Sequence, residues 1–80
     1  MDVLPSALRH GTSNEDIQHA LRGAFVVEQV AEDPDRYLVL GPDRSGRFLE
    51  LIVLDRPAGP AVIHAMEMRQ QYRAFLEGER

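Results

Sequence analysis

The sequence contains no cysteine and no lysine, and it has no apolar run long enough to cross a membrane. Without cysteine, disulfides are excluded, and the three scattered histidines do not form a zinc signature. We therefore expect neither a metal site nor another cofactor. The N-terminus also lacks the basic and then apolar order of a secretory signal, so we expect a cytoplasmic protein with no membrane segment.

The length of the chain limits it to one domain. Eighty residues are enough for one hydrophobic core and too few for two. With 44% hydrophobic and 28% charged residues, the composition is that of an ordinary globular protein. We expect residues 1–80 to form a single domain. Such a core supplies only about 3–5 kcal/mol of net stability, so a partner subunit could contribute to folding.

The charge is unevenly distributed along the chain. The formal net charge of −4 opposes nucleic-acid binding, which depends mainly on positive charge. Residues 1–35 hold seven acids and two arginines, whereas residues 36–80 hold six acids and seven arginines. The C-terminal half is therefore where an anionic ligand is expected.

Turn and helix signals divide the chain into short elements. A helix is expected near residues 5–10, ended by Gly11, and a second from the capping-box residues 12–15 to Gly23. Apolar, β-branched runs predict strands over residues 24–31, 36–40, 48–54 and 61–66, and helical periodicity follows Glu67. Short turns favour antiparallel pairing. The prediction is an α+β fold of two N-terminal helices, a four-stranded antiparallel meander sheet and a C-terminal helix packed on it.

The strand-to-helix junction at residues 62–76 holds the strongest candidates for chemistry. His64, Arg69 and Arg73 lie within ten residues there, and we interpret them as catalytic. Guanidinium groups can hold a scissile phosphate, and an imidazole can transfer protons near neutral pH. Tyr72 is interpreted as a stacking platform for a base, and Arg36 as a second phosphate ligand.

Each of these residues also has a structural interpretation. The arginine pair can be neutralised by Glu67, Glu50 or Glu77 on a solvated face. His64 can be a partly buried histidine with satisfied hydrogen bonds, and Tyr72 a core aromatic. Arg36 can be an ion-pair partner of an acid in the preceding turn, at positions 33 and 35.

The order of motifs resembles the BrnT group of bacterial type II toxins, small members of the RelE/ParE-like superfamily. The resemblance rests on the opening Arg-His-Gly-Thr-Ser-Asn-Glu-Asp at residues 9–16, on Arg36 before a strand ending in Gly41, and on Val-Ile-x-Ala at 62–65 before an arginine-bearing segment. It implies a RelE/ParE-like fold and a ribonuclease that stops translation. The family's active residues carry over to Arg36 and Arg73, and His10 matches its basic-His-Gly opening as a substrate-binding residue.

Two of the candidates depart from the family pattern. His64 stands where the family tends to have serine, so His64 and Arg69 are proposed from local chemistry alone. The leading hypothesis is a toxin that cleaves RNA and is silenced by a DNA-binding antitoxin encoded alongside, and an oligomer formed through the antitoxin is left open. The alternative is a non-enzymatic interaction module of the same fold that docks an acidic partner protein.

Overall fold

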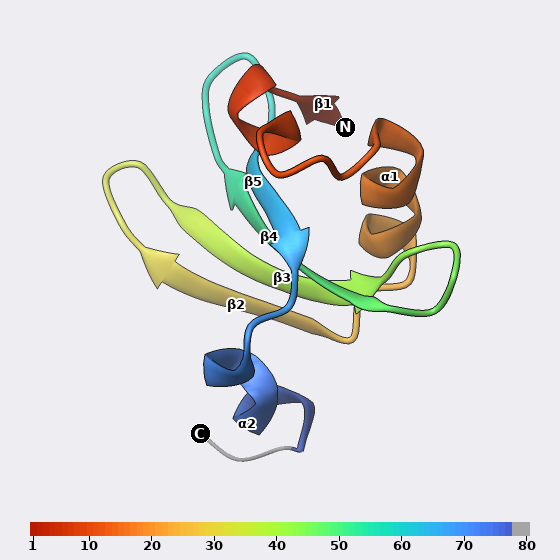
Figure 1. Cartoon of the computed structure of the whole chain (residues 1–80). Helices are drawn as coiled ribbons and strands as arrows, with labels where there is room; N and C mark the ends of the chain where they lie inside the picture. Colours follow the sequence, from red (N-terminus) through yellow and green to blue (C-terminus); the bar gives the residue numbers. More distant parts are fainter. Residues whose placement is uncertain (78–80) are drawn as a thin grey trace.

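Five strands form one sheet, in the order β1-β5-β4-β3-β2, in the computed structural model, which describes residues 1–77 (Figure 1). The strands are β1 (Asp2–Val3), β2 (Val26–Ala31), β3 (Arg36–Pro42), β4 (Phe48–Leu54) and β5 (Ala61–Glu67). The helical elements are the 3₁₀ helices η1 (Pro5–Leu8) and η2 (Gln70–Tyr72) and the α-helices α1 (Asn14–Arg22) and α2 (Arg73–Leu76). None of these helices has the length and apolar character needed to cross a membrane.

The sheet is mixed, so the predicted four-stranded antiparallel meander is wrong. Strands β2 to β5 pair antiparallel in chain order, but β1 joins as a fifth strand parallel to β5. Its two residues, Asp2 and Val3, lie opposite Ala61 and Val62. A strand of two residues shows no alternation in the sequence, and only pairing with distant β5 defines it.

The predicted pair of N-terminal helices is also wrong, because the first segment is a 3₁₀ turn. The backbone N–H of Leu4 donates to the Val62 carbonyl at 2.9 Å, and the hydroxyl of Ser6 donates to the Ile63 carbonyl at 2.6 Å. These bonds hold the segment against β5. Gly11, at φ +82°, then turns the chain toward α1. The short segment between these two constraints forms a 3₁₀ helix of four residues, Pro5–Leu8.

The C-terminal helix is much shorter than predicted, and with it the expected RelE/ParE-like arrangement of elements is overturned. Strand β5 continues through Glu67, which lies opposite Leu49, and Met68 N–H donates to the Phe48 carbonyl at 2.9 Å. Helical structure begins only at Gln70, and α2 has four residues. Pairing with β4 therefore prevails over the helical spacing of apolar residues after Glu67.

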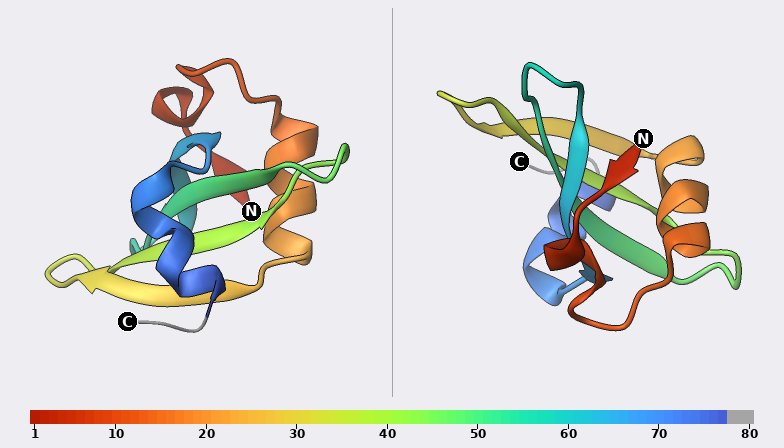
Figure 2. Two further views of the ribbon diagram at one scale, coloured as in Figure 1. Left: turned by 60° about the horizontal axis from the view of Figure 1, so that its bottom comes forward. Right: turned by 90° about the horizontal axis from the view of Figure 1, so that it is seen from above.

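The two faces of the sheet are covered by different parts of the chain. Helix α1 and η1 lie on one side, and the C-terminal segment lies across the other (Figures 1 and 2). The core on the α1 side consists of Ala7, Ile17, Ala20, Val39, Leu49, Leu51, Val53, Val62 and Ala65. On the opposite side Leu38, Leu40 and Glu50 are also buried. A charged residue is thus buried among apolar neighbours on the face that carries the C-terminal segment.

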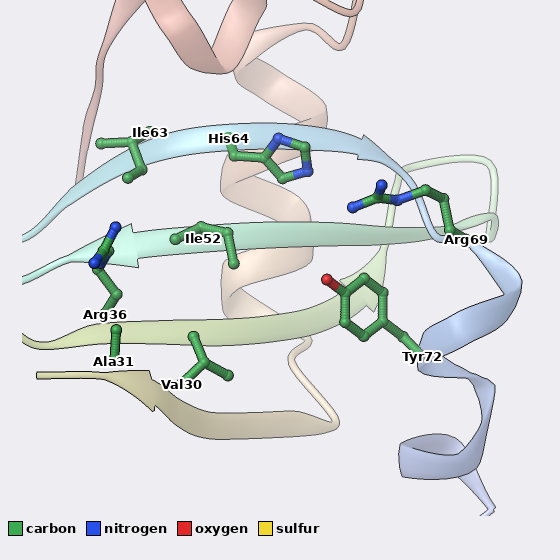
Figure 3. A pocket seen from close by; sticks show the side chains of 8 residues that line it. All are labelled: Val30, Ala31, Arg36, Ile52, Ile63, His64, Arg69 and Tyr72. Atoms are coloured by element: carbon green, nitrogen blue, oxygen red, sulfur yellow. The ribbon is translucent and has the colours of Figure 1, made fainter.

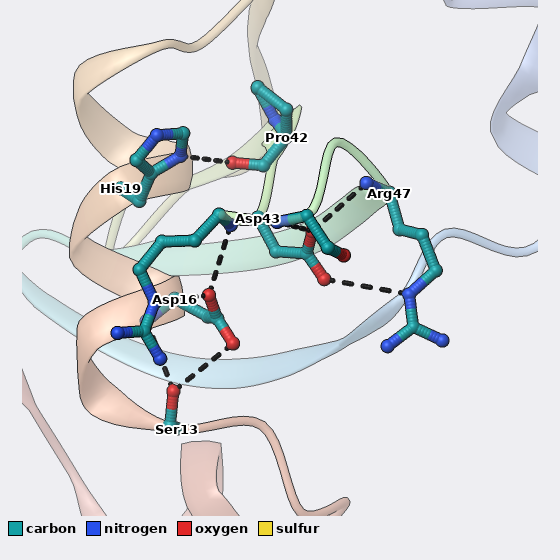
Figure 4. A network of polar contacts seen from close by, with 8 residues as sticks. Ser13, Asp16, His19, Pro42, Asp43 and Arg47 are labelled. Carbon is teal, nitrogen blue, oxygen red and sulfur yellow. Dashed lines mark hydrogen bonds and ion pairs between the residues drawn. The ribbon is translucent and has the colours of Figure 1, made fainter.

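Polar contacts tie α1 to the β3–β4 turn (Figure 4). Ser13 caps the helix by accepting from Asp16 N–H at 3.1 Å, and the Asp16 carboxylate accepts from Arg44 N–H at 3.0 Å and Nε at 2.9 Å. The hydrogen bond from the Arg44 side chain lowers the pKa of Asp16. His19 Nδ1 donates to the Pro42 carbonyl at 2.9 Å. These polar residues therefore orient a helix on the sheet.

Close packing of α1 on β3 predicts a strict requirement for glycine at position 41. A Cβ on Gly41 would lie 2.2 Å from the carbonyl oxygen of Ala20. We expect Gly41→Ala to lower the free energy of unfolding by about 3 kcal/mol, measured by urea denaturation. The control is Gly23→Ala, whose Cβ would meet Pro42 at 3.4 Å, an ordinary contact. Equal losses in the two variants would contradict this account.

Candidate functional site

A groove of about 490 Å³ opens on the sheet face opposite α1 (Figure 3). Its walls come from β2, β3, β4, β5 and the segment that follows β5. The lining residues are Val30, Ala31, Arg36, Ile52, Ile63, His64, Arg69 and Tyr72. Four residues singled out by the sequence, Arg36, His64, Arg69 and Tyr72, therefore line one cavity. Its volume is within the usual range for small-molecule and cofactor sites.

A bulge in β5 places His64 in this groove. Ile52 lies opposite His64 while the next residue, Val53, lies opposite Val62, so Ile63 is an extra residue in β5. Consequently Ile63 and His64 both line the groove, whereas Val62 is in the core on the other face. Strict alternation would place His64 and Val62 on the same face. The bulge separates them.

A second irregularity shapes the opposite wall. In β2, Gln29 lies opposite Tyr37 and Ala31 lies opposite Arg36, so Val30 is the extra residue. Val30 and Ala31 both line the groove as a result. Bulges are over-represented beside active sites because they redirect side chains out of the regular pleat. Here one bulge lies on each side of the groove.

The buried carboxylate of Glu50 holds the polar end of the groove together. Its side chain is 1% exposed. It accepts from His64 Nε2 at 2.9 Å, from Arg69 backbone N–H at 2.9 Å, and from the Arg69 guanidinium at 2.7 Å (Nη2) and 3.1 Å (Nε). Burial acts to raise the pKa of Glu50, but the hydrogen bonds from Arg69 and His64 prevail and lower it. Glu50 is therefore a carboxylate at neutral pH.

The contact with Glu50 fixes which ring nitrogen of His64 carries a hydrogen. An ionised carboxylate can only accept a hydrogen bond, so His64 Nε2 carries a hydrogen and donates it. Proton exchange is left to Nδ1. The side chain is 26% exposed, and its ring meets the ring of His10 edge-on with centroids 5.6 Å apart. His64 is thus oriented by one buried group and contacts a second imidazole.

Arg69 lies between Glu50 and Tyr72. The carbon of its guanidinium is 5.7 Å from the centroid of the Tyr72 ring, within the range of a cation–π contact. The Tyr72 ring in turn contacts Phe75, with centroids 6.4 Å apart. The hydrogen bond to Glu50 raises the pKa of Arg69, which stays charged, and its side chain is 48% exposed. Arg69 therefore presents a positive charge to the groove while its other contacts fix its position.

The remaining predicted residues lie apart from this cluster. Arg36 lines the opposite end of the groove (Figure 3), and within residues 1–77 it forms no ion pair with the aspartates of the preceding turn. His10 lies outside the groove and reaches it only through its contact with His64. Arg73 does not line the groove, and its Nε pairs with Glu77 at 3.8 Å.

Sequence reasoning considered Glu50 only as a counter-charge on a solvated face and missed its central position. The available signal was local. Glu50 is the only charged residue in β4, where every neighbour is apolar, and a charged residue in such a strand is buried only when it is paired. Among residues 1–77 no group of three or more acidic or histidine side chains is placed to hold a metal ion.

No family model matches the chain, and neither a curated protein nor a solved structure matches it. The interpretation of the groove therefore rests on its own geometry.

The buried carboxylate makes stability dependent on pH. We expect Glu50→Gln to lower the free energy of unfolding by about 2 kcal/mol at pH 7, because charge-assisted hydrogen bonds are lost. Folding lowers the pKa of Glu50 from its ordinary value of 4.5. The ionised side chain therefore adds to the free energy of unfolding above pH 4.5, and this contribution is lost as the pH falls through the folded pKa. Urea denaturation from neutral to acid pH should show the difference between wild type and variant shrinking below pH 4.5.

The control for this measurement is Glu67→Gln, the same change at an exposed position near the end of β5. It should change the free energy of unfolding by less than about 0.5 kcal/mol. A difference between wild type and Glu50→Gln that stays constant with pH would contradict the assignment of an ionised, paired Glu50.

Proposed function

We propose that the protein is a metal-independent endoribonuclease, the BrnT-like toxin of a bacterial type II toxin–antitoxin system, which inhibits translation in the cytoplasm. The observation that carries the proposal is the position of His64. A buried carboxylate orients its imidazole beside a fixed guanidinium, at the end of an accessible groove. A proton-transfer group next to a phosphate ligand is the combination that cleavage by the RNA 2′-hydroxyl requires.

In this proposal His64 is the general base. Its Nδ1 takes the proton of the 2′-hydroxyl, the 2′ oxygen forms a bond to phosphorus, and the bond from phosphorus to the 5′ oxygen breaks. The leaving 5′ oxygen takes a proton from solvent, and the products are a 2′,3′-cyclic phosphate and a 5′-hydroxyl. Glu50 stabilises the imidazolium that forms. Arg69 stabilises the added negative charge on the phosphate.

The two ends of the groove would contact different phosphates. Arg36 lies opposite Leu54, four residues along β4 from Glu50. At 3.3–3.4 Å per residue, the positions of Glu50 and Arg36 along the strands are about 13 Å apart. At that distance Arg36 would contact a phosphate other than the scissile one. We therefore assign Arg36 to substrate binding. Tyr72 and the apolar floor at Ile52 offer a surface on which a base can stack.

The alternative is a non-enzymatic module that docks an acidic partner protein through its arginines. One observation favours it. Glu50 already pairs with the guanidinium of Arg69. An arginine paired in this way is suited to a structural role rather than to binding a phosphate. In that case the arginine at the other end of the groove, Arg36, would dominate recognition. The two functions differ in whether the isolated protein cuts RNA.

Cleavage of a fluorescent oligoribonucleotide in the presence of EDTA tests the proposal. Glutamine can still donate to Glu50 but cannot transfer a proton, so we expect His64→Gln to lower the cleavage rate at least about 100-fold. Arg47→Ala is the matched control, because Arg47 is 70% exposed after the β3–β4 turn and pairs with Asp43 outside the groove, and its rate should change less than about threefold. A substrate with 2′-O-methyl groups should stay intact.

Expression in cells provides the second readout. The wild-type protein should arrest growth and translation, and His64→Gln should be harmless at the same level of folded protein. A small DNA-binding protein encoded by the neighbouring gene should relieve the arrest when co-expressed. The endoribonuclease proposal is wrong if the wild-type protein leaves RNA uncut, and retained binding to an acidic protein would then support the docking module.

A further inference from the structure

Strand β2 forms an exposed edge of the sheet. It pairs with β3 on one side and is the last strand in the sheet order, so its other side is not paired within residues 1–77. Two of its side chains, Val27 at 64% and Val30 at 51%, are among the most exposed large apolar residues, as is Phe25 just before the strand, at 67%. An edge strand of this kind offers unpaired backbone groups and apolar side chains together.

Apart from the bulge at Val30, β2 lacks the usual protections of an edge. Natural edge strands carry lysine, proline, bulges or inward-facing charges, or they are very short. Strand β2 has six residues, and Glu28 is its only charged residue. An apolar cavity beside exposed apolar side chains adds to the contiguous apolar surface that marks interaction sites.

Such a cavity lies beside β2 on the α1 face. It has a volume of about 300 Å³, and its lining residues are Met1, Leu21, Ala24, Val27, Tyr37, Val39 and Val53. Alternate side chains of a strand point to the same face, so a strand added along β2 would direct every second side chain toward this cavity. Backbone hydrogen bonds would give such a partner affinity, and the cavity would select apolar side chains.

The charge around the edge identifies the kind of partner. Residues 24–35 contain no basic residue, and the turn after β2 contains three acids, Glu32, Asp33 and Asp35. A second copy of the chain would bring two such acidic segments together, and like charges on adjacent strands are destabilising. A segment rich in arginine or lysine has the complementary charge. The edge is therefore suited to a basic partner.

We propose that β2 accepts, as a sixth strand, an extended segment of a partner protein that is apolar at alternate residues and carries arginine or lysine. The inference does not rest on RNA cleavage, because the apolar cavity lies on the face opposite His64.

Selection from a library of displayed random peptides tests this surface with the full chain as target. Peptides of about ten residues are long enough to span β2 and its flanks. The enriched sequences should alternate apolar residues with arginine or lysine. A synthetic peptide of the enriched sequence should slow amide hydrogen exchange in β2. N-methylation of alternate backbone amides should abolish its binding, because strand pairing needs those donors.

Substitutions locate the binding surface. Val27→Asp should weaken binding of the synthetic peptide at least about tenfold by fluorescence anisotropy. Leu8→Asp is the matched control, because it adds the same charge at another exposed apolar residue, 45% exposed on η1, and it should retain wild-type affinity. Val27→Thr keeps the β-branched shape and should weaken binding severalfold, which guards against a folding defect in Val27→Asp.

Three outcomes would overturn the proposal. The first is enrichment of acidic or non-alternating peptides, and the second is equal affinity for wild type and both Val27 variants. The third is a concentration-dependent dimer in sedimentation that Val27→Asp abolishes, since a second copy would then occupy the edge. Val27→Asp should leave RNA cleavage by the isolated protein within about twofold of wild type. The test of peptide binding at β2 and the test of RNA cleavage can therefore fail independently.

Discussion

The buried carboxylate of Glu50 is the constraint on which the groove depends. It accepts hydrogen bonds from a strand side chain, from a guanidinium and from a backbone N–H of the segment after β5. A carboxylate in apolar surroundings is stable only when its charge is compensated, so the chain must bring His64 and Arg69 to it. One interaction therefore fixes the tautomer of the histidine, the position of the arginine and the path of the chain toward η2.

The two bulges convert this local constraint into a cavity. A regular pleat would place one residue in two of each strand on the groove face. The extra residues Ile63 and Val30 put two consecutive side chains there on each side. The apolar core on the α1 face is preserved because Val62 and Ala65 both remain buried in it. Stability and a concave surface are thus obtained from opposite faces of the same strands.

Much of the strand pattern was predictable from the sequence, because alternating apolar runs and turn residues are local signals. The strand β1, the shortened α2 and the face occupied by His64 were not. Each depends on pairing between distant residues: Val3 with Val62, Leu49 with Glu67, and Ile52 with His64. For the site, proximity along the chain brought His64, Arg69 and Tyr72 to attention. The apolar neighbours of Glu50 indicate that it is buried, but its contact with His64 depends on pairing between β4 and β5, which no local pattern reports.

Strand β2 contributes to two surfaces at once. Val30 and Ala31 line the groove, while Val27 lines the apolar cavity on the other face. A segment that pairs with this strand and a ligand in the groove would therefore act on the same stretch of backbone, which includes the bulge at Val30. If one occupant changes the affinity of the other, thermodynamic linkage makes the factor the same in both directions. A partner on β2 would then alter binding in the groove without touching His64.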